Sequence, residues 1–450
     1  MTVSPLDSEV YGNLFGTPRM RALFSDATRF QRMLDVEAAL ARAQGRLGVI
    51  PSEAARTISA TASASILDTD RMRARTEVVG LPVVPLVAAL VEACGTEAGR
   101  YVHWGATTQD IVDTGLVLQM RDAFALLDDD LGQAIRATAG LADRYRAAVM
   151  AGRTHLQHAV PVTFGFKAAV WLASLLDQRQ RLETLRANVL VAQYSGAAGT
   201  LSAVADHGIS IADALAEELG LAAPDISWHV RRGGIAETGC FLGVLCGALG
   251  KIAKDVILLA QTEVGEVAEP HVSGRGGSST MPQKRNPIMS EYVLASARNV
   301  HALVPVLLGG MIQDHERPTD SWQAEWVALP QMFVMTAGAL HYATAILEGL
   351  AVDPARMRAN LDLTYGLIMA EAVQTALRPV LGHDRAHHAV EAACKRAMAE
   401  RMALKDALAA VPEIGGSFSA EEIDAILEPA NYTGCANAFI DRVLARLTTD

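Results

Sequence analysis

The stretch FLGVLCGALGKIAKDVILL, residues 241–259, decides which class of fold this chain adopts. Large apolar residues recur along it at alternating steps of three and four residues, which places them on one side of a helix as a continuous seam. Such a seam is typical of helices that pack nearly parallel in a bundle. We therefore expect an all-α fold with a helical bundle at its centre. The seam consists of Leu242, Leu245, Leu249, Ile252, Val256 and Leu259.

Two further long helices are predicted from apolar residues at helical spacing. One extends from about residue 107 to 145, and the other from about residue 160 to 191, with Pro161 in its first turn. Helices of about 30–40 residues are roughly 45–60 Å long, which exceeds the width of a small domain. Aromatic residues make up only 5% of the chain and alternating strand patterns are rare, so we expect few strands.

Glycine and proline residues divide the chain into three predicted domains. They are an N-terminal helical domain (residues 1–104), a central long-helix domain (105–351) and a C-terminal helical domain (352–450). Outside the central domain, shorter helices are expected at residues 28–47, 51–64, 82–94 and 432–447.

Composition and charge narrow the possible functions. Half of the 450 residues are hydrophobic and 20% are charged, as in folded globular proteins. The net charge of −11 argues against a nucleic-acid partner, and the lack of a P-loop or GxGxxG motif argues against a nucleotide cofactor. The five cysteines form no CxxC pair, and no apolar segment follows the N-terminus, so we expect a reduced, cytoplasmic protein without a signal peptide.

Residues 326–347 contain no charged side chain and are numerous enough to cross a membrane. The stretch also contains Pro330, Gln331 and His341, which lie around the helix, and no basic cluster flanks it. We therefore expect a helix that is buried on all sides in the bundle, and no membrane partner.

Three polar loops interrupt the helical pattern. They are residues 101–110 (YVHWGATTQD), 152–161 (GRTHLQHAVP) and 274–287 (GRGGSSTMPQKRNP). Each gathers hydrogen-bonding side chains where a helix is expected to begin. Because functional residues are often presented on loops of a rigid scaffold, these loops are the predicted site.

The third loop carries the strongest chemical signal. Its glycines allow a mobile backbone around Ser278 and Ser279, and Lys284 and Asn286 follow. Serine hydroxyls beside an ammonium group suit the binding of carboxylates, and such a loop can close over a substrate. The alternative is a flexible surface loop in which Asn286 caps the next helix and Pro287 begins it.

For the other two loops, too, both a functional and a purely structural interpretation are possible. His155 lies next to Thr154, and a histidine side chain can move protons or hold an anion, although a structural histidine is the plainer explanation. Thr107 and Asp110 match a helix capping box. Thr107 and Thr108 also place hydroxyl and N–H groups at a helix N-terminus, which is a ready anion site.

A metal site is not expected. His383, His387 and His388 lie at helical spacing with Asp384, but no further cluster completes a ligand set. We interpret them as a solvated helix face.

Residues 277–287 (GSSTMPQKRNP) closely resemble the signature GSSxMPxKxNP of the fumarase/aspartase superfamily. The likeness extends over nearly the whole chain and is greatest to the cycloisomerase branch of that superfamily. The segments that resemble this branch include Met33–Gln44, Thr262–Pro270, Asp314–Arg317 and the tail from Pro429.

This resemblance implies a three-domain, mostly α subunit whose central helices form the core of a homotetramer. Each active site would collect the three loops from three different subunits. The resemblance also implies no metal, no organic cofactor and a small anionic di- or tricarboxylate as substrate.

The resemblance further implies a role for each loop residue. Ser278 would be the general base, and Lys284 and Asn286, with Ser279, would hold a substrate carboxylate. Thr107, Thr108 and Thr154 would bind substrate, and His155 would donate hydrogen bonds or act as the acid. Because the shared chemistry builds extra negative charge on a carboxylate, the site should be locally basic. Candidates for this charge include Arg232 and Arg317, with Arg153, Arg231 and Arg285.

The activity implied first is the lactonisation of 3-carboxy-cis,cis-muconate to a carboxymuconolactone in aromatic (protocatechuate) catabolism. The alternative is a C–N or C–O lyase that releases fumarate from a succinyl-type substrate such as adenylosuccinate, argininosuccinate or an N-substituted aspartate. His155 favours the alternative, because many cycloisomerases of this branch have tryptophan there. A structural oligomer with a dead site is a third reading, against which the intact Ser278, Lys284 and Asn286 argue.

Overall fold

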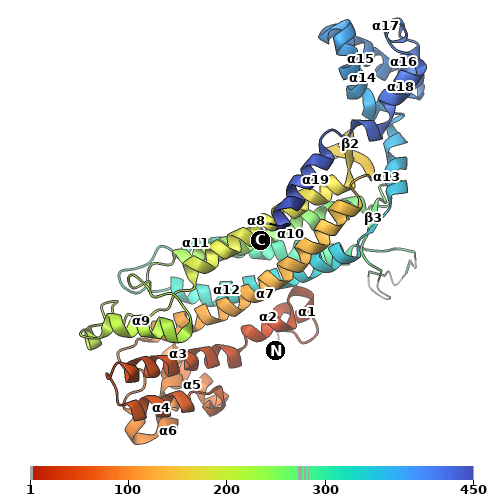
Figure 1. Cartoon of the computed structure of the whole chain (residues 1–450). Helices are drawn as coiled ribbons and strands as arrows, with labels where there is room; N and C mark the ends of the chain where they lie inside the picture. Colours follow the sequence, from red (N-terminus) through yellow and green to blue (C-terminus); the bar gives the residue numbers. More distant parts are fainter. Residues whose placement is uncertain (1–3, 272–275, 278–279, 282, 449–450) are drawn as a thin grey trace. The chain divides into compact units, whose positions relative to one another are not determined.

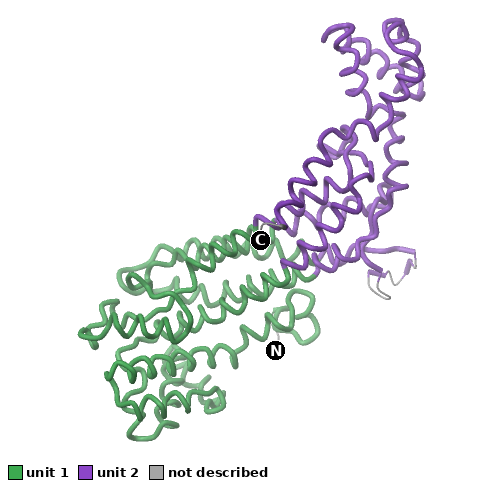
Figure 2. Tube along the Cα trace, in the orientation of Figure 1, with its two compact units in different colours: residues 1–130, 178–247, 292–341 green, residues 131–177, 248–291, 342–450 purple. Residues whose placement is uncertain are grey.

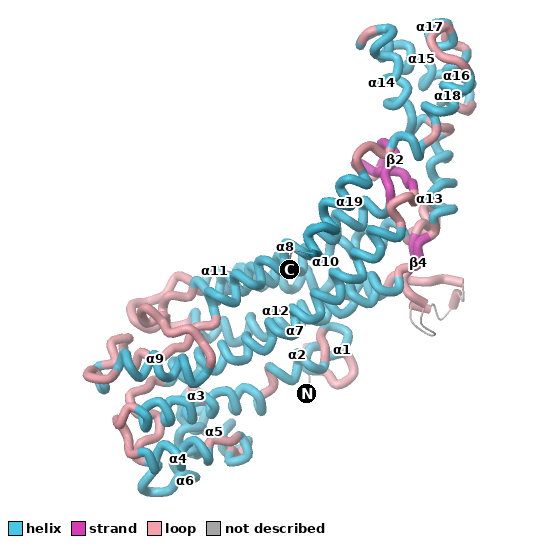
Figure 3. The backbone as a smooth tube through the Cα atoms, in the orientation of Figure 1, coloured by secondary structure: helices cyan, strands magenta, loops and turns pink. Residues whose placement is uncertain are grey.

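The computed structural model describes residues 4–271, 276–277, 280–281 and 283–448, and most of them are helical (Figures 1 and 3). The prediction of an all-α fold is confirmed. By internal contacts the chain divides into two compact units, which Figure 2 distinguishes by colour. Unit 1 comprises residues 1–130, 178–247 and 292–341, and unit 2 comprises residues 131–177, 248–291 and 342–450. The three predicted domains stay a prediction.

Five long helices each contribute residues to both units. The first of them has 37 residues, so the predicted helix at about 107–145 is confirmed. The five are α7 (Thr108–Arg144), α8 (Phe164–Val189), α10 (Gly233–Leu259), α11 (Ile288–Gly309) and α12 (Ser321–Gly349).

The apolar seam of residues 242–259 lies in α10 and is buried along its whole length. Leu242, Leu245 and Leu249 are 0% exposed, and the least buried member, Leu259, is 4% exposed. This burial is the main source of stability for such a helix, because its apolar area is removed from water. The seam therefore serves as core, as its spacing predicted.

In unit 1, α10 packs closely against α11 through a second face, on which Gly239 and Gly243 lie. A Cβ at Gly239 would lie 2.5 Å from Leu307, and one at Gly243 would lie 2.9 Å from Val304. His301 also contacts the backbone oxygen of Gly243 through Nε2 at 2.9 Å. Only glycine allows the two helices to come this close.

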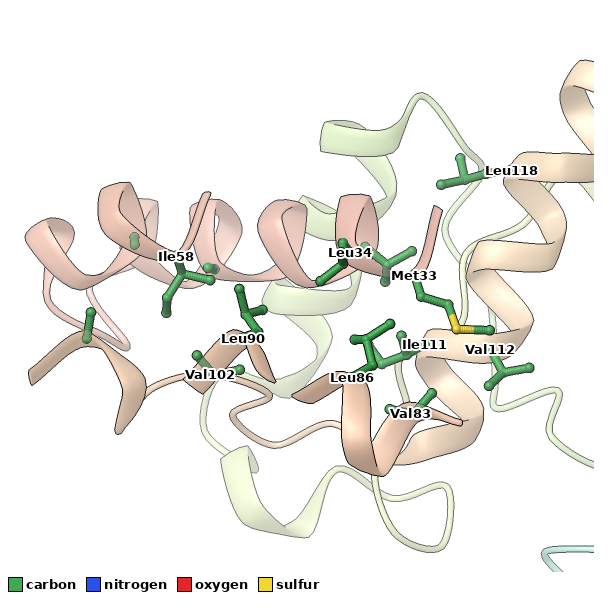
Figure 4. Close-up of a cluster of buried hydrophobic side chains, with 14 of the residues drawn as sticks. Met33, Leu34, Ile58, Val83, Leu86, Leu90, Val102, Ile111, Val112 and Leu118 are labelled. Atoms are coloured by element: carbon green, nitrogen blue, oxygen red, sulfur yellow. The ribbon is translucent and has the colours of Figure 1, made fainter. Parts of the chain in front are cut away.

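The N-terminal part of unit 1 is a cluster of shorter helices around its own core. Leu34, Ile58, Leu86 and Leu90 are at most 1% exposed there and face one another in Figure 4. They come from α3, α4 and α6, which correspond to the three helices predicted in this region. The α-helices of this part are α1 (Gly12–Phe15), α2 (Pro18–Leu23), α3 (Asp26–Arg46), α4 (Ser52–Thr61), α5 (Thr69–Val79) and α6 (Val83–Gly99), and α9 (Gly208–Leu219) packs against α3.

The second predicted loop is a β-hairpin. Strands β1 (Val149–Thr154) and β2 (Gln157–Thr163) pair antiparallel, with Thr154 opposite Gln157. The prediction of a helix from about residue 160 was therefore wrong at its start, since α8 begins at Phe164. Pro161 lies in β2 opposite Ala151, and a two-stranded hairpin tolerates proline because each strand has a free edge.

The C-terminal part of unit 2 contains a small helical cluster with a separate core, which includes Val373, Leu377 and Leu404. His383, His387 and His388 lie on its exposed surface in α15, where His383 Nδ1 lies 2.7 Å from Arg378 Nη2. A second short ladder joins β3 to β4. The elements are β3 (Val267–Ala268), β4 (Ala351–Val352), α13 (Pro354–Leu361), α14 (Ala370–Leu381), α15 (His383–Glu400), α16 (Leu404–Ala409), α17 (Pro412–Gly415), α18 (Ala420–Leu427) and α19 (Ala436–Ala445).

Residues 326–347 lie in α12 and are largely core. Leu329, Met332 and Phe333 are 0% exposed, although Val327 is 61% exposed in the single chain. Among the described residues, the one helix whose length and composition would suffice for a membrane span is α11, and 28% of its most apolar stretch is buried.

Candidate active site

The first polar loop, residues 101–110, leads into α7 in unit 1. Tyr194 Oη donates a hydrogen bond to the backbone oxygen of Trp104 at 3.1 Å. Gly105 has a φ of +75°, and a Cβ there would lie 2.6 Å from Tyr194 Oη, so the turn requires glycine. Thr107 and Thr108 follow, half-buried, at the N-terminal end of α7. Unpaired N–H groups at this end of a helix attract anions.

His103 ties the same loop to α3. Its Nδ1 lies 2.6 Å from Oε1 of Glu37, whose side chain is 1% exposed. Burial by itself lowers the pKa of His103, but the Glu37 carboxylate outweighs this effect and raises the pKa above the usual 6.5.

Asp110 does more than the capping that its sequence position suggests. Its carboxylate accepts a hydrogen bond from the Thr107 N–H at 2.9 Å, so that half of the predicted capping box is present. It also accepts hydrogen bonds from the backbone N–H groups of Ser195 and Gly196, each at 3.0 Å. Its fourth partner is Nε2 of the buried His229, at 2.7 Å. Asp110 therefore joins three segments of unit 1 at the start of α7.

Arg317 lies beside these segments and forms no ion pair with a carboxylate of the described residues. Its Nε donates to Oε1 of Gln109 at 3.0 Å, and its Nη1 donates to the backbone oxygen of Ala197 at 2.9 Å. Its Nη2 lies 3.4 Å from Nδ1 of His229. None of these acceptors is a carboxylate. A half-buried guanidinium beside a helix N-terminus can attract a substrate carboxylate.

Arg232, another predicted binding residue, is placed differently. It is 2% exposed, and its guanidinium donates to Asp113 Oδ2 at 2.7 Å and to Glu325 Oε1 at 2.9 Å. Trp322 Nε1 donates to the same Asp113 carboxylate at 3.0 Å. Burial lowers the pKa of Arg232, but the two carboxylates outweigh it and raise that pKa, so the side chain is charged. This geometry favours a role in joining α7 to α12.

The hairpin in unit 2 presents Thr154 and His155 to solvent. His155 has a φ of +50° and Leu156 one of +63°, which makes them the two central residues of a type I′ turn. Positive φ is unfavourable for residues with a Cβ, and such strain often accompanies functional loops. Leu156 is 72% exposed. The tip therefore displays an imidazole and an apolar side chain outward.

Arg153, one residue before the tip, is anchored by a buried carboxylate. Nη1 and Nη2 donate to Oε2 and Oε1 of Glu266 at 3.0 and 2.6 Å. Asn360 Nδ2 donates to Glu266 Oε1 as well, at 2.8 Å. Burial, and then the charge of Arg153, lower the pKa of the neighbouring His158, which favours its neutral form.

In the described part of the third loop, backbone hydrogen bonds join its beginning to its end. The Asn286 N–H donates to the backbone oxygen of Gly276 at 3.0 Å, and Gly277 forms a bridge with Arg285. Lys284 is exposed and Asn286 is half-buried. Ser278 and Ser279 lie outside the described residues.

The helix after this loop is capped from another segment. Glu269 accepts hydrogen bonds from the N–H groups of Met289 and Ser290 at 3.1 and 2.7 Å, and from Ser290 Oγ at 2.6 Å. The helix begins at Ile288, so Asn286 and Pro287 lie one residue further from it than the sequence interpretation had them. A carboxylate at this position also complements the helix dipole.

The predicted residues therefore fall into two groups. Thr107, Thr108, Arg232 and Arg317 belong to unit 1, whereas Thr154, His155, Lys284 and Asn286 belong to unit 2. Sequence reasoning missed the roles of His229, Glu266 and Glu269. The two glutamates lie in residues 262–270, which carried part of the family resemblance, but His229 has no local motif that could have identified it.

Two other features lie apart from these residues. A cavity of about 420 Å³ at the start of α10 is lined by Trp228, Arg231 and Gly234 among others. Of the residues predicted for the site, only the candidate cation Arg231 is among the described residues that line it. Within the part of the chain that the structure describes, no group of three or more His, Cys, Asp or Glu side chains could hold a metal ion.

The chain is similar in sequence to known proteins. The profile of a family described as "Lyase" matches residues 15–302, and one described as "Adenylosuccinate lyase C-terminus" matches residues 366–443. A protein of Pseudomonas aeruginosa named 3-carboxy-cis,cis-muconate cycloisomerase is 47% identical, over 97% of this chain and 96% of that protein.

Solved structures are similar as well. That of 3-carboxy-cis,cis-muconate lactonizing enzyme from Pseudomonas putida is 43% identical with a TM-score of 0.93, over 98% of this chain and 99% of that one. The structure of fumarate lyase from Mesorhizobium sp. is 44% identical with a TM-score of 0.91, over 96% of this chain and 98% of that one.

Proposed function

Because this chain belongs to the fumarase/aspartase superfamily of lyases, we propose that it is a cofactor-free cycloisomerase that lactonises 3-carboxy-cis,cis-muconate. The observation that carries the proposal is the similarity, at 47% identity over nearly the whole of both chains, to a relative that bears this name. The guanidinium of Arg317 supports it, because it contacts Gln109 in the first turn of α7, has no carboxylate partner among the described residues, and the substrate would carry three carboxylates.

The reaction adds one carboxylate oxygen of the substrate to a carbon of a C=C bond. The C–O bond forms as the π electrons move toward the carbon next to another carboxylate, which becomes an aci-carboxylate with extra negative charge. A proton delivered to that carbon completes the lactone. Donors that are already in place stabilise such charge best, because they need no reorganisation during the reaction.

We assign the proton transfer to Ser278, which would deliver the proton in the lactonising direction and remove it in reverse. A serine hydroxyl is a weak acid and base, so it needs activation by neighbouring groups in a closed site. Lys284 and Asn286, with Ser279, would hold the carboxylate on which charge develops. Thr154 and His155 would donate hydrogen bonds from the hairpin tip.

The substrate's other carboxylates would meet the N-terminal end of α7. There, Thr107 and Thr108 offer hydroxyl groups, and Arg317 offers its guanidinium. Arg232 would act indirectly, by holding α7 and α12 together through Asp113 and Glu325.

We further propose that the chain works as a homotetramer in which each active site takes loops from three subunits. Apolar side chains of the long helices support this, because water contacts them in the single chain. They include Val244 (48% exposed), Val306 (39%), Leu308 (45%) and Val327 (61%). The same exposure on α11 is then a subunit interface rather than a surface for lipid. A cytoplasmic location agrees with five unpaired cysteines and a net charge of −11.

A fumarate-releasing lyase is the second candidate. The observation that favours it is His155 at the exposed hairpin tip, where an imidazole could protonate a leaving group. The similarity to the fumarate lyase from Mesorhizobium sp. supports it too.

The test offers purified protein 3-carboxy-cis,cis-muconate and, separately, argininosuccinate, adenylosuccinate and N-substituted aspartates. Loss of the ultraviolet absorbance of the conjugated diene, with a lactone identified by NMR, is the expected result. Ser278→Ala serves as the inactive control. Release of fumarate from a succinyl adduct, with no consumption of the muconate, would replace the first proposal by the second.

A further inference from the structure

His229 connects two parts of the unit 1 site and is itself sealed from solvent. Its side chain is 1% exposed. One ring nitrogen, Nε2, lies 2.7 Å from Oδ1 of Asp110, and the other, Nδ1, lies 3.4 Å from Nη2 of Arg317. The backbone oxygen of the same residue accepts a hydrogen bond from Gln109 Nε2 at 2.9 Å. Each of the two ring nitrogens of His229 therefore contacts a residue of the site.

The chemistry of the partners decides where the proton lies. A guanidinium can only donate, so Nδ1 must be the acceptor and carries no hydrogen. Nε2 then carries the hydrogen and donates it to the Asp110 carboxylate. This arrangement is a neutral imidazole in one defined tautomer, selected by a carboxylate on one side and a cation on the other.

Asp110 carries this link into the substrate-binding loop. The carboxylate that receives the His229 hydrogen also holds the Thr107 N–H at 2.9 Å. A displacement of His229 would therefore affect the first turn of α7 as well as Arg317.

The contacts of Arg317 leave part of its guanidinium for a ligand. Of the five N–H donors in the side chain, three are used by Gln109, Ala197 and His229 among the described residues, which leaves two, one on each Nη. N–H groups on the two Nη atoms can donate to the two oxygens of one carboxylate. A long arginine side chain has large rotamer entropy, so fixing it before substrate arrives lowers the cost of binding.

We propose that His229 is a positioning residue, which holds Arg317 in the orientation that receives a substrate carboxylate. This inference rests on the proposed function only in taking a carboxylate substrate, and it does not depend on which one. His229 itself does not touch the reacting atoms.

The first test reads the tautomer in the ligand-free protein. Long-range ¹H–¹⁵N NMR of histidine-labelled protein should show the His229 ring, assigned by its loss in His229→Gln, as neutral with hydrogen on Nε2. The Nδ1 signal should shift in Arg317→Gln. Hydrogen on Nδ1, or no response to Arg317→Gln, overturns the proposal whatever the substrate proves to be.

The second test is a double-mutant cycle. Gln at residue 229 can keep a donor near the Nε2 position but no acceptor toward Arg317, whereas Asn can keep the acceptor but not the donor. We expect His229→Gln, which loses the acceptor toward Arg317, to raise KM for 3-carboxy-cis,cis-muconate about tenfold, with kcat changed less than threefold. His229→Asn, which keeps that acceptor, should raise KM less than His229→Gln does. In the Arg317→Gln background, His229→Gln should add nothing further, since coupled residues are not additive. His207→Gln, at an exposed histidine of the same unit, is the matched control and should change neither constant.

Additive effects, or a fall in kcat at unchanged KM, would overturn the positioning role. If the wild type does not consume the muconate, the proposed function fails, and the cycle is then measured as dissociation constants for fumarate and propane-1,2,3-tricarboxylate by calorimetry. Non-additive weakening of either ligand supports the role of His229, and additive or absent weakening of both rejects it.

Discussion

Arg153 and Glu266 form a two-pronged ion pair, with Nη1 at 3.0 Å from Oε2 and Nη2 at 2.6 Å from Oε1. The Glu266 side chain is 0% exposed and that of Arg153 is 20% exposed. Arg153 lies in β1, directly before Thr154 and the turn residue His155, so this pair fixes the base of the hairpin tip to the segment after α10.

Glu266→Gln should destabilise the protein by roughly 3 kcal/mol, the low end for a broken buried ion pair, because Arg153 can regain some contact with water. Urea unfolding followed by circular dichroism measures the change. Glu263→Gln, at an exposed glutamate three residues earlier, is the control and should fall within about 0.5 kcal/mol of the wild type. Equal effects of the two substitutions would show that the pair contributes nothing.

Ser278→Ala should lower kcat by about 10²–10⁴-fold without changing the thermal midpoint, because general acid–base catalysis has this magnitude. Ser279→Ala should have a milder effect, since that hydroxyl is assigned to binding. Steady-state kinetics on the muconate compares the two. A larger loss in Ser279→Ala would move the proton transfer to the second serine.

His155→Trp should keep lactonisation within about tenfold of the wild type. The reason is that the attacking carboxylate stays in the product, so no leaving group needs a proton. His155→Asn is the matched control, because asparagine accepts the positive φ of this turn but has no imidazole. A loss of lactonisation in both folded variants would mean that the imidazole takes part in the chemistry.

The His103–Glu37 pair should make stability depend on pH in a defined direction. Its raised pKa means that the folded protein binds a proton more tightly than the unfolded chain, so the contribution is fully present below about pH 6.5. It is lost as pH rises through the raised pKa. The difference in unfolding free energy between wild type and His103→Gln should therefore be larger at pH 5.5 than at pH 9. A pH-independent difference would contradict a charged pair.

Leu308→Asp should dissociate the proposed tetramer, because it places a charge on an apolar side chain that is 45% exposed in the single chain. Sedimentation velocity at micromolar concentration measures the change in mass. Val78→Asp, at a residue of α5 that is 76% exposed, is the control and should leave the assembly intact. A stable wild-type monomer under these conditions would remove the basis of the shared active site.

The helical elements could be predicted from the sequence because their signals are local. The steps of three and four residues in α10 place its apolar side chains on one buried face in any context that offers a core. The hairpin at β1 and β2 could not be predicted in the same way. Its turn residues, His155 and Leu156, lack the Asn-Gly or Asp-Gly signal that marks a type I′ turn, and the strand pairing depends on partners that the local pattern does not reveal.

The loops that carry the candidate catalytic residues could also be predicted from the sequence, but the role of each arginine could not. Nothing in the sequence around Arg153, Arg232 and Arg317 shows which of them pairs with a carboxylate. Glu266 lies 113 residues from Arg153, and Asp113 and Glu325 lie 119 and 93 residues from Arg232. Since the energy between charges depends on their separation in space and on burial, only the tertiary structure decides which arginine is paired with a carboxylate and which, like Arg317, has no carboxylate partner among the described residues.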